Sequence, residues 1–236
     1  MREHNFSTAD LALFAQSPFA AWMELLDKRQ QWHEGDPDHS LAFYRRDELV
    51  VPARHNVLQQ RLMGRHGGAV NIDPLGFDAE RHLSTQNAMG TGIALITNAF
   101  LAEMPLNGRL DFLVRQEQSS QLGNFHYVPA CLAREEYDPT QMPVELCCFV
   151  DMLEHVQGVR PREFLWITDG QGDHPQVTSI ASDDWMFDYR QLKIGYRKML
   201  SNFDAREVLD PRESSDWGRW SGYARQLISE LERQSG

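Results

Sequence analysis

Several basic side chains are spaced so that they can act together on phosphate groups. Lys193, Arg197 and Lys198 fall on one predicted helix, and Arg190 adds a fourth cation. Such a group of cations can contact the phosphates of a nucleic-acid backbone. It can equally be a solvated helix face, and the sequence leaves both interpretations open.

A second group contains neighbouring acids. Arg134, Glu135 and Glu136 stand at the end of a predicted strand. Carboxylates so placed can form a site for a divalent cation. Charge at the end of a strand also discourages pairing with other chains, and the pattern favours this simpler explanation.

The histidines and cysteines do not form a recognisable site. Four histidines are candidate metal ligands: His55, His66, His82 and His126. None of them has the spacing of a metal-binding motif such as His-x-x-x-His. The three cysteines contain no Cys-x-x-Cys pair, and Cys147-Cys148 fits core packing on a helix. The sequence also lacks a Walker-type phosphate loop and a Gly-x-Ser-x-Gly motif.

The composition is that of an acidic globular protein. The 236 residues carry 23 Lys and Arg against 34 Asp and Glu, which gives a formal net charge of −11. This balance argues against a protein that coats nucleic acid through a broad basic surface, but it allows a local basic groove. The longest weakly polar stretch, residues 90–100, is too short to span a membrane, and no signal-peptide pattern opens the chain. We therefore expect a cytoplasmic protein without a membrane partner.

Helical patterns open and close the chain. Ser17-Pro18 is typical of an N-cap followed by the first helical residue, and Phe19, Trp22 and Leu26 continue the pattern on one apolar face. Further helices are expected at residues 53–64, 77–89 and 140–156, after Ser182, and within 212–236.

Strand patterns occupy the middle of the chain. They are predicted at residues 93–103, 108–116, 124–137, 162–168 and 176–180. The polar connection 116–123 indicates an antiparallel hairpin between the second and third of these strands. The order of elements predicts an α/β fold with a mixed sheet flanked by helices.

Four segments, taken in this order, resemble the RecB-like nuclease domain of the PD-(D/E)XK superfamily. They are residues 6–11 with 17–23, 108–115, 146–161 and 188–192. They include Ser-Pro-Phe-x-x-Trp at Ser17 and Gln-Gly-x-x-Pro at Gln157, which are fairly specific in combination. The similarity is greatest to the amino-terminal nuclease module of large bacterial RecB-like nuclease/helicase proteins.

The resemblance implies one domain over residues 1–236 with a restriction-endonuclease-like core. Residues 1–68 would form a helical N-terminal part, 92–202 the core sheet and helices, and 212–236 a C-terminal helix. Members of this superfamily cut nucleic acid with Mg²⁺ or Mn²⁺. An Asp on one hairpin strand and a (Asp/Glu)-x-Lys on the next hold the metal and activate a water molecule.

Only part of this catalytic set is present. The hairpin aspartate matches Asp111 in Gly-Arg-Leu-Asp-Phe. On the second strand the acid and the lysine would fall near Ala130 and Leu132, where neither occurs. On the helix after the hairpin, Glu145 stands at the family's Gln position and Phe149 at its Tyr position.

The flanking motifs also depart from the family pattern. The upstream histidine falls near Leu58, with Gln59 in place of an acid and His55 one turn early. Some relatives carry cysteines around a C-terminal Arg-Trp pair, as a metal or iron–sulfur element. Here Ser214 to Trp217 precede Arg219-Trp220, without a cysteine. The sequence thus keeps the scaffold and loses much of the chemistry.

Three functions remain open. The first is a catalytically degenerate nuclease fold in DNA repair or defence, which binds nucleic acid or scaffolds a separately encoded helicase or nuclease. The second is an active Mg²⁺- or Mn²⁺-dependent nuclease with a migrated site, in which Asp111 acts with Glu145 as the catalytic and metal-binding residues, or acts with the Glu135-Glu136 pair. The third is a protein-interaction module. In either nucleic-acid role, the expected contacts come from five cations: Arg109, Arg115, Arg134, Lys193 and Arg197.

Overall fold

The computed structural model describes residues 5–29, 59–64, 68–132, 144–168, 175–207 and 209–235. The chain divides into two compact units, one formed by Met1–Thr8 with Arg46–Tyr189 and the other by Ala9–Arg45 with Arg190–Gly236. In the described part of the chain, no helix combines the length and the apolar character that crossing a membrane requires.

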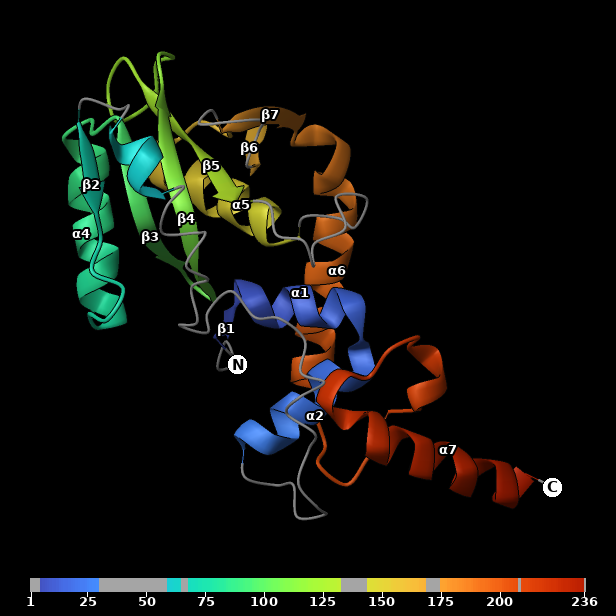
Figure 1. Cartoon of the computed structure of the whole chain (residues 1–236). Coiled ribbons are helices and arrows are strands. Elements are labelled where there is room, and N and C mark those ends of the chain that lie inside the picture. The colour runs from blue at the N-terminus through green and yellow to red at the C-terminus, as the bar shows by residue number, and fades with distance from the viewer. Residues whose placement is uncertain are drawn as a thin grey trace. The chain divides into compact units, whose positions relative to one another are not determined.

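A mixed seven-stranded sheet forms the centre of the first unit (Figure 1). Its strands follow the order β2-β3-β4-β5-β6-β7, and β1 pairs with β4. The pairs β1/β4, β2/β3 and β5/β6 are parallel, and the others are antiparallel. The strands are β1 (Phe6–Ser7), β2 (Ala69–Asn71), β3 (Leu95–Glu103), β4 (Leu106–Gln116), β5 (His126–Leu132), β6 (Glu163–Thr168) and β7 (Gln176–Ala181). The predicted α/β class and mixed sheet are therefore confirmed.

The helices also follow the predicted order. They are α1 (Thr8–Gln16), α2 (Pro18–Lys28), α4 (Asp78–Gly90), α5 (Val144–Gln157), α6 (Asp183–Ser201) and α7 (Ser221–Ser235), with short 3₁₀ turns at Pro211–Glu213 and Gly218–Trp220. Trp220 was expected inside the last helix, but it lies in the 3₁₀ turn before α7. Residues 53–58 and 133–143, which were assigned partly to a helix and a strand, lie outside the described residues.

Helix α4 covers the outer edge of β3. Because β2 pairs with β3 only from Leu95 to Thr97, the rest of that edge has free backbone N–H groups. The N–H of Phe100 donates to Thr85 Oγ1 at 3.1 Å, and that of Ala102 donates to His82 Nδ1 at 3.2 Å. These two side chains satisfy the edge that the short β2 leaves open.

Two residues of the family-like motifs have structural roles in this unit. A β-carbon at Gly108 would collide with the side chain of Thr8, so glycine is required where the start of α1 approaches β4. At the end of α5, the amide of Gln157 accepts from Tyr127 N at 2.8 Å and donates to Tyr127 O at 3.0 Å. This amide therefore joins α5 to the backbone of β5.

The middle of α5 is buried on nearly all sides. Cys147 and Cys148 are fully buried, as their predicted core packing requires. Burial raises the pKa of the Cys147 thiol to about 12, and the negative charge of Asp151 adds to the effect. The Asp151 carboxylate accepts a hydrogen bond from Tyr189 Oη at 2.9 Å.

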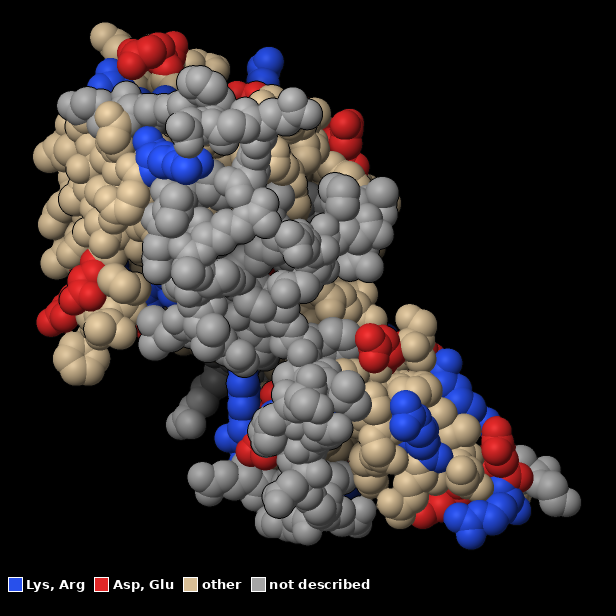
Figure 2. Space-filling model, in the orientation of Figure 1, with Lys and Arg blue, Asp and Glu red and all other residues tan. Residues whose placement is uncertain are grey.

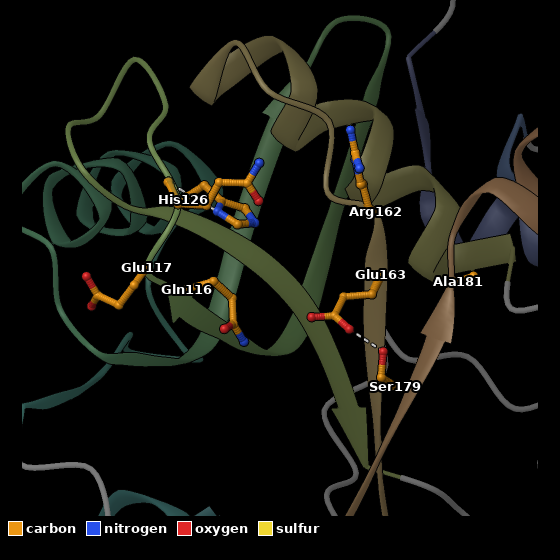
Figure 3. A pocket seen from close by; sticks show the side chains of 8 residues that line it. Gln116, Glu117, His126, Arg162, Glu163, Ser179 and Ala181 are labelled. Carbon is orange, nitrogen blue, oxygen red and sulfur yellow. Dashed lines mark hydrogen bonds between the residues drawn. The ribbon is translucent and has the colours of Figure 1, made fainter.

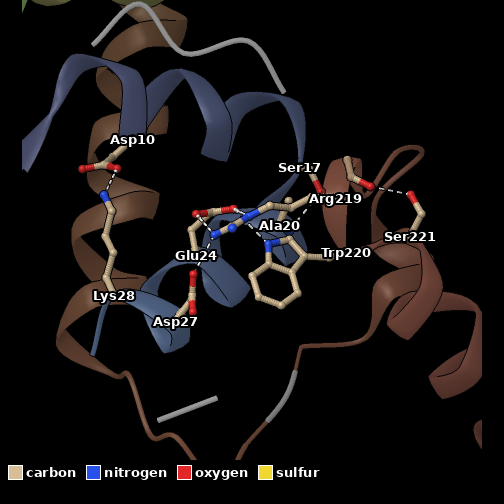
Figure 4. A network of polar contacts seen from close by, with 10 residues as sticks. Asp10, Ser17, Ala20, Glu24, Asp27, Lys28, Arg219, Trp220 and Ser221 are labelled. Atoms are coloured by element: carbon tan, nitrogen blue, oxygen red, sulfur yellow. Dashed lines mark hydrogen bonds and ion pairs between the residues drawn. The ribbon is translucent and has the colours of Figure 1, made fainter. Parts of the chain in front are cut away.

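An ion-pair network holds α2 to the C-terminal segment in the second unit (Figure 4). The guanidinium of Arg219 binds both oxygens of Glu24, at 2.6 and 2.7 Å, and also Asp27 at 2.8 Å. Trp220 Nε1 donates to the same Glu24 carboxylate at 3.0 Å. Ser17 caps α2 as predicted, because its hydroxyl accepts from Ala20 N at 3.1 Å.

We expect Arg219→Met to lower the free energy of unfolding of the second unit by roughly 2–4 kcal/mol, because it leaves the Glu24 carboxylate largely buried without its cation. Glu24→Gln should cost less, since its amide oxygen still accepts from Trp220. Urea denaturation followed by tryptophan fluorescence measures both. The control is Arg206→Gln in the exposed pair with Asp204, which should leave stability unchanged; an equal loss there would show that the network has no special role.

Candidate functional site

Asp111 lies where β4 and β5 stop pairing. The two strands pair from Gln116 opposite His126 as far as Phe112 opposite Ala130. Beyond that point Asp111 Oδ2 accepts the N–H of Leu132 at 2.9 Å, and the Asp111 side chain is buried, with 7% exposure. The carboxylate thus serves as a hydrogen-bond acceptor for a backbone group that the diverging strands no longer pair.

The register of the sheet shows which residues share a face with Asp111. Its neighbour Phe112 packs in one apolar cluster with Ala130 and Leu132. Because successive side chains on a strand point to opposite faces, Asp111 belongs to the other face, as do Pro129 and Cys131 of β5. The positions expected for the acid and the lysine are therefore shifted by one residue from those assigned by sequence. Residues 129–132 contain neither an acid nor a lysine, so the two groups are absent from both faces of this part of β5.

The second candidate ligand, Glu145, is in the first turn of α5 and is buried, with 5% exposure. Helix α5 packs on β3, β4 and β5, so the structure places both candidate acids inside the same unit. Among the described residues, no three His, Cys, Asp or Glu side chains form a group that could hold a metal ion. Glu135 and Glu136 lie outside those residues.

Asn98 lies opposite Asp111 on the other neighbour of β4. The pairs Thr97–Phe112 and Ala99–Leu110 flank this position. Asn98 has a φ of 53°, the left-handed conformation, in the middle of a strand. Its Nδ2 donates to Asn71 Oδ1 at 2.6 Å, and its Oδ1 accepts from Arg109 Nη2 at 2.6 Å. Backbone strain of this kind persists only where surrounding contacts stabilise it.

The amide oxygen of Asn71 is the centre of a wider network. Besides Asn98, it accepts from Thr97 Oγ1 at 2.7 Å and from Gln59 Nε2 at 3.2 Å. Gln59 also donates to Thr97 Oγ1 at 2.9 Å. Sequence reasoning missed Asn71, Thr97 and Asn98. The available signal was the polar Thr97-Asn98 pair within the otherwise apolar strand pattern of residues 93–103.

Two of the predicted nucleic-acid contacts already have partners in the first unit. Arg109 is buried, with 9% exposure, and donates to Asn98. Arg115 donates to the carbonyl of Gly92 at 3.0 Å, pairs with Glu117 at 3.0 Å and lies over the ring of Phe125, 4.6 Å from its centroid. These contacts hold both guanidinium groups against the protein.

The other three predicted nucleic-acid contacts lie outside the described part of the first unit. Lys193 and Arg197 lie on the part of α6 that belongs to the second unit, and each has an interaction partner within the protein. Arg134 lies outside the described residues. On the face drawn in Figure 2, the described Lys and Arg side chains are scattered among Asp and Glu side chains and do not merge into one basic surface.

Comparison with models of known protein families finds no match to this chain, and comparison with curated proteins finds none either.

We expect Asp111→Ala to lower the free energy of unfolding by about 1–3 kcal/mol, because it leaves the buried N–H of Leu132 without an acceptor. Asp111→Asn should retain most of the stability, since an amide oxygen can accept the same hydrogen bond. Thermal and urea denaturation of the two variants test this ordering. Equal stability of Asp111→Ala and the wild type would show that the contact does not support the fold.

Asn98 offers a separate test of the strained position. Asn98→Ala should destabilise the protein by roughly 2–4 kcal/mol, because it combines an unfavourable left-handed backbone with the loss of the bonds to Asn71 and Arg109. Asn98→Gly loses the same bonds but removes the backbone strain, so it should be the milder change. Urea denaturation measures the difference; an alanine variant at least as stable as the glycine variant would contradict the left-handed conformation.

Proposed function

We propose that this protein is a RecB-like nuclease fold of DNA metabolism that no longer cuts nucleic acid and acts as a scaffolding subunit. The observation that carries the proposal is the environment of Asp111. Its carboxylate accepts a backbone N–H, and the β5 residues beside it are Pro129, Ala130, Cys131 and Leu132. No carboxylate or ammonium group comes from this stretch.

The arrangement around Asp111 supports the family resemblance without its chemistry. The strand with Asp111 pairs antiparallel with the next strand, and α5 follows, in the order that the resemblance implies. In the family reaction, a lysine orients the attacking water or stabilises charge on the phosphate. Asp111 and Glu145 alone supply neither that cation nor a free carboxylate pair at the hairpin. The residues that the structure describes therefore do not fit the superfamily's catalytic metal site.

The contacts of Arg109 and Arg115 within the protein favour scaffolding over nucleic-acid binding. Phosphate contacts require side chains that can leave the protein surface and reach the backbone of the nucleic acid. Arg109 is bonded to Asn98 inside the protein, and Arg115 is held by Gly92, Glu117 and Phe125. A formal net charge of −11 also opposes association with a polyanion.

Incubation with single- and double-stranded DNA in Mg²⁺ or Mn²⁺ should give no cleavage by the wild type. Calorimetric titration of Mn²⁺ should show no site that depends on Asp111. The variants to compare are Asp111→Asn and Glu145→Gln, which preserve side-chain size, with the exposed Glu232→Gln as the matched control.

Metal-dependent cleavage that disappears in Asp111→Asn and Glu145→Gln, but not in Glu232→Gln, would replace the scaffolding proposal with an active nuclease. Circular dichroism of each variant is needed so that loss of activity is not confused with loss of fold.

A further inference from the structure

A polar pocket lies at one end of the sheet of the first unit (Figure 3). It encloses about 530 Å³. That volume falls within the range of small-molecule sites, roughly 300–1,000 Å³. Four neighbouring strands or their immediate ends supply its walls, so the polar groups are carried by a rigid sheet and not by one loop.

The sheet register brings His126 and Glu163 to the same face of this pocket. The parallel β5/β6 ladder begins with Ala130 opposite Leu165. His126 lies four residues before Ala130 and Glu163 two residues before Leu165, so both belong to the face that Ala130 and Leu165 share. Both side chains line the pocket, so a ligand within it can contact both.

His126 presents a hydrogen-bond acceptor to this space. The side chain is 6% exposed, and its Nδ1 lies 3.3 Å from the carbonyl oxygen of Gln118. A carbonyl cannot donate, so Nδ1 is the donor of this contact, and when the ring carries a single proton Nε2 is an acceptor. Within the described residues, no group hydrogen-bonds to Nε2. A nearly buried imidazole therefore has one nitrogen available to a ligand.

Glu163 supplies a second acceptor. The hydroxyl of Ser179, on the neighbouring strand β7, donates to Glu163 Oε2 and orients the carboxylate (Figure 3). No contact in the described part of the chain occupies Oε1. A carboxylate oxygen and an imidazole nitrogen that face one space suit a ligand group with several N–H donors and a positive charge, which is an ammonium group.

The remaining charges of the pocket indicate the other end of the ligand. Glu117 is neutralised by its ion pair with Arg115, at 3.0 Å. Arg162 is exposed, and its guanidinium has no ion pair among the described residues. Figure 3 shows Arg162 and Glu163 leaving the backbone in different directions. The pocket thus offers one unpaired negative group and one unpaired positive group.

We propose that this pocket binds a small zwitterion, with its ammonium group on Glu163 and His126 and its carboxylate on Arg162. The proposal does not depend on the scaffolding role, because Glu163 and His126 lie on the face of the sheet opposite to Asp111, and Arg162 precedes β6. It requires no chemical step and no group beyond the side chains described.

Three probes with the same carbon chain separate the charge requirements. They are ε-aminocaproate, which is a zwitterion, hexamethylenediamine, which is a dication, and adipate, which is a dianion. Ligand-observed NMR and calorimetric titration of the wild type should detect ε-aminocaproate binding at ~10 mM or below, and each of the other two should bind at least several-fold more weakly. No binding of ε-aminocaproate at that concentration, or equal binding of the diamine, would overturn the proposal.

Matched variants locate the site. Glu163→Gln should weaken ε-aminocaproate binding roughly tenfold or more, because it removes the charge that faces the ammonium group. Arg162→Gln should weaken it as well, and should reduce the advantage of the zwitterion over the diamine. Glu232→Gln on α7 is the control and should change nothing. Unchanged affinity in Glu163→Gln, with the fold intact by circular dichroism, would place the probe elsewhere and refute the assignment.

Discussion

The buried polar row in the centre of the sheet is the constraint on which the rest of the first unit depends. Arg109 and Asp111 are both buried on β4, the strand that pairs with β1, β3 and β5. An unsatisfied buried polar group costs about 1–3 kcal/mol, and a charged one costs more. The neighbouring strands must therefore supply partners. Asn98 does so from β3 in a left-handed conformation, and the backbone of Leu132 does so from β5.

If the protein is the inactive nuclease fold that we propose, this constraint explains how an acid can remain at a nuclease-like position without the chemistry. On this interpretation, the acid and the lysine of β5 are replaced by Pro129 and Cys131, which share the face of Asp111 and bring no charged group into the core. Removing Asp111 would leave an N–H without an acceptor at the point where the strands diverge. Selection for stability alone can therefore preserve one catalytic-type residue while the others drift. A retained aspartate is then weak evidence for retained activity.

Individual helices and strands could be predicted from the sequence better than the strand register and the side-chain contacts between them. Ser17-Pro18 specifies the start of α2 through a local cap, and α5 follows from the apolar spacing within a single segment. The pairing of Asp111 with β5 depends on a register between two segments, and a one-residue error moves every side chain to the other face. The strands Phe6–Ser7 and Ala69–Asn71 escaped prediction because two or three residues carry no usable period. The role of Asn98 depends on partners in two other segments, β2 and β4, and could not be predicted from its own segment.

The two faces of β5 separate the two sites that the fold could support. Asp111 shares its face with Pro129 and Cys131, whereas His126 lies on the face of Val128, Ala130 and Leu132. In the role that we propose, loss of nuclease chemistry from the first face would not need to alter the second, because alternate residues of one strand pack in different environments. The sheet can thus lose a catalytic centre and still present a preorganised polar pocket. The absence of catalysis that we propose for the first face is therefore compatible with the ligand binding that we propose for the second.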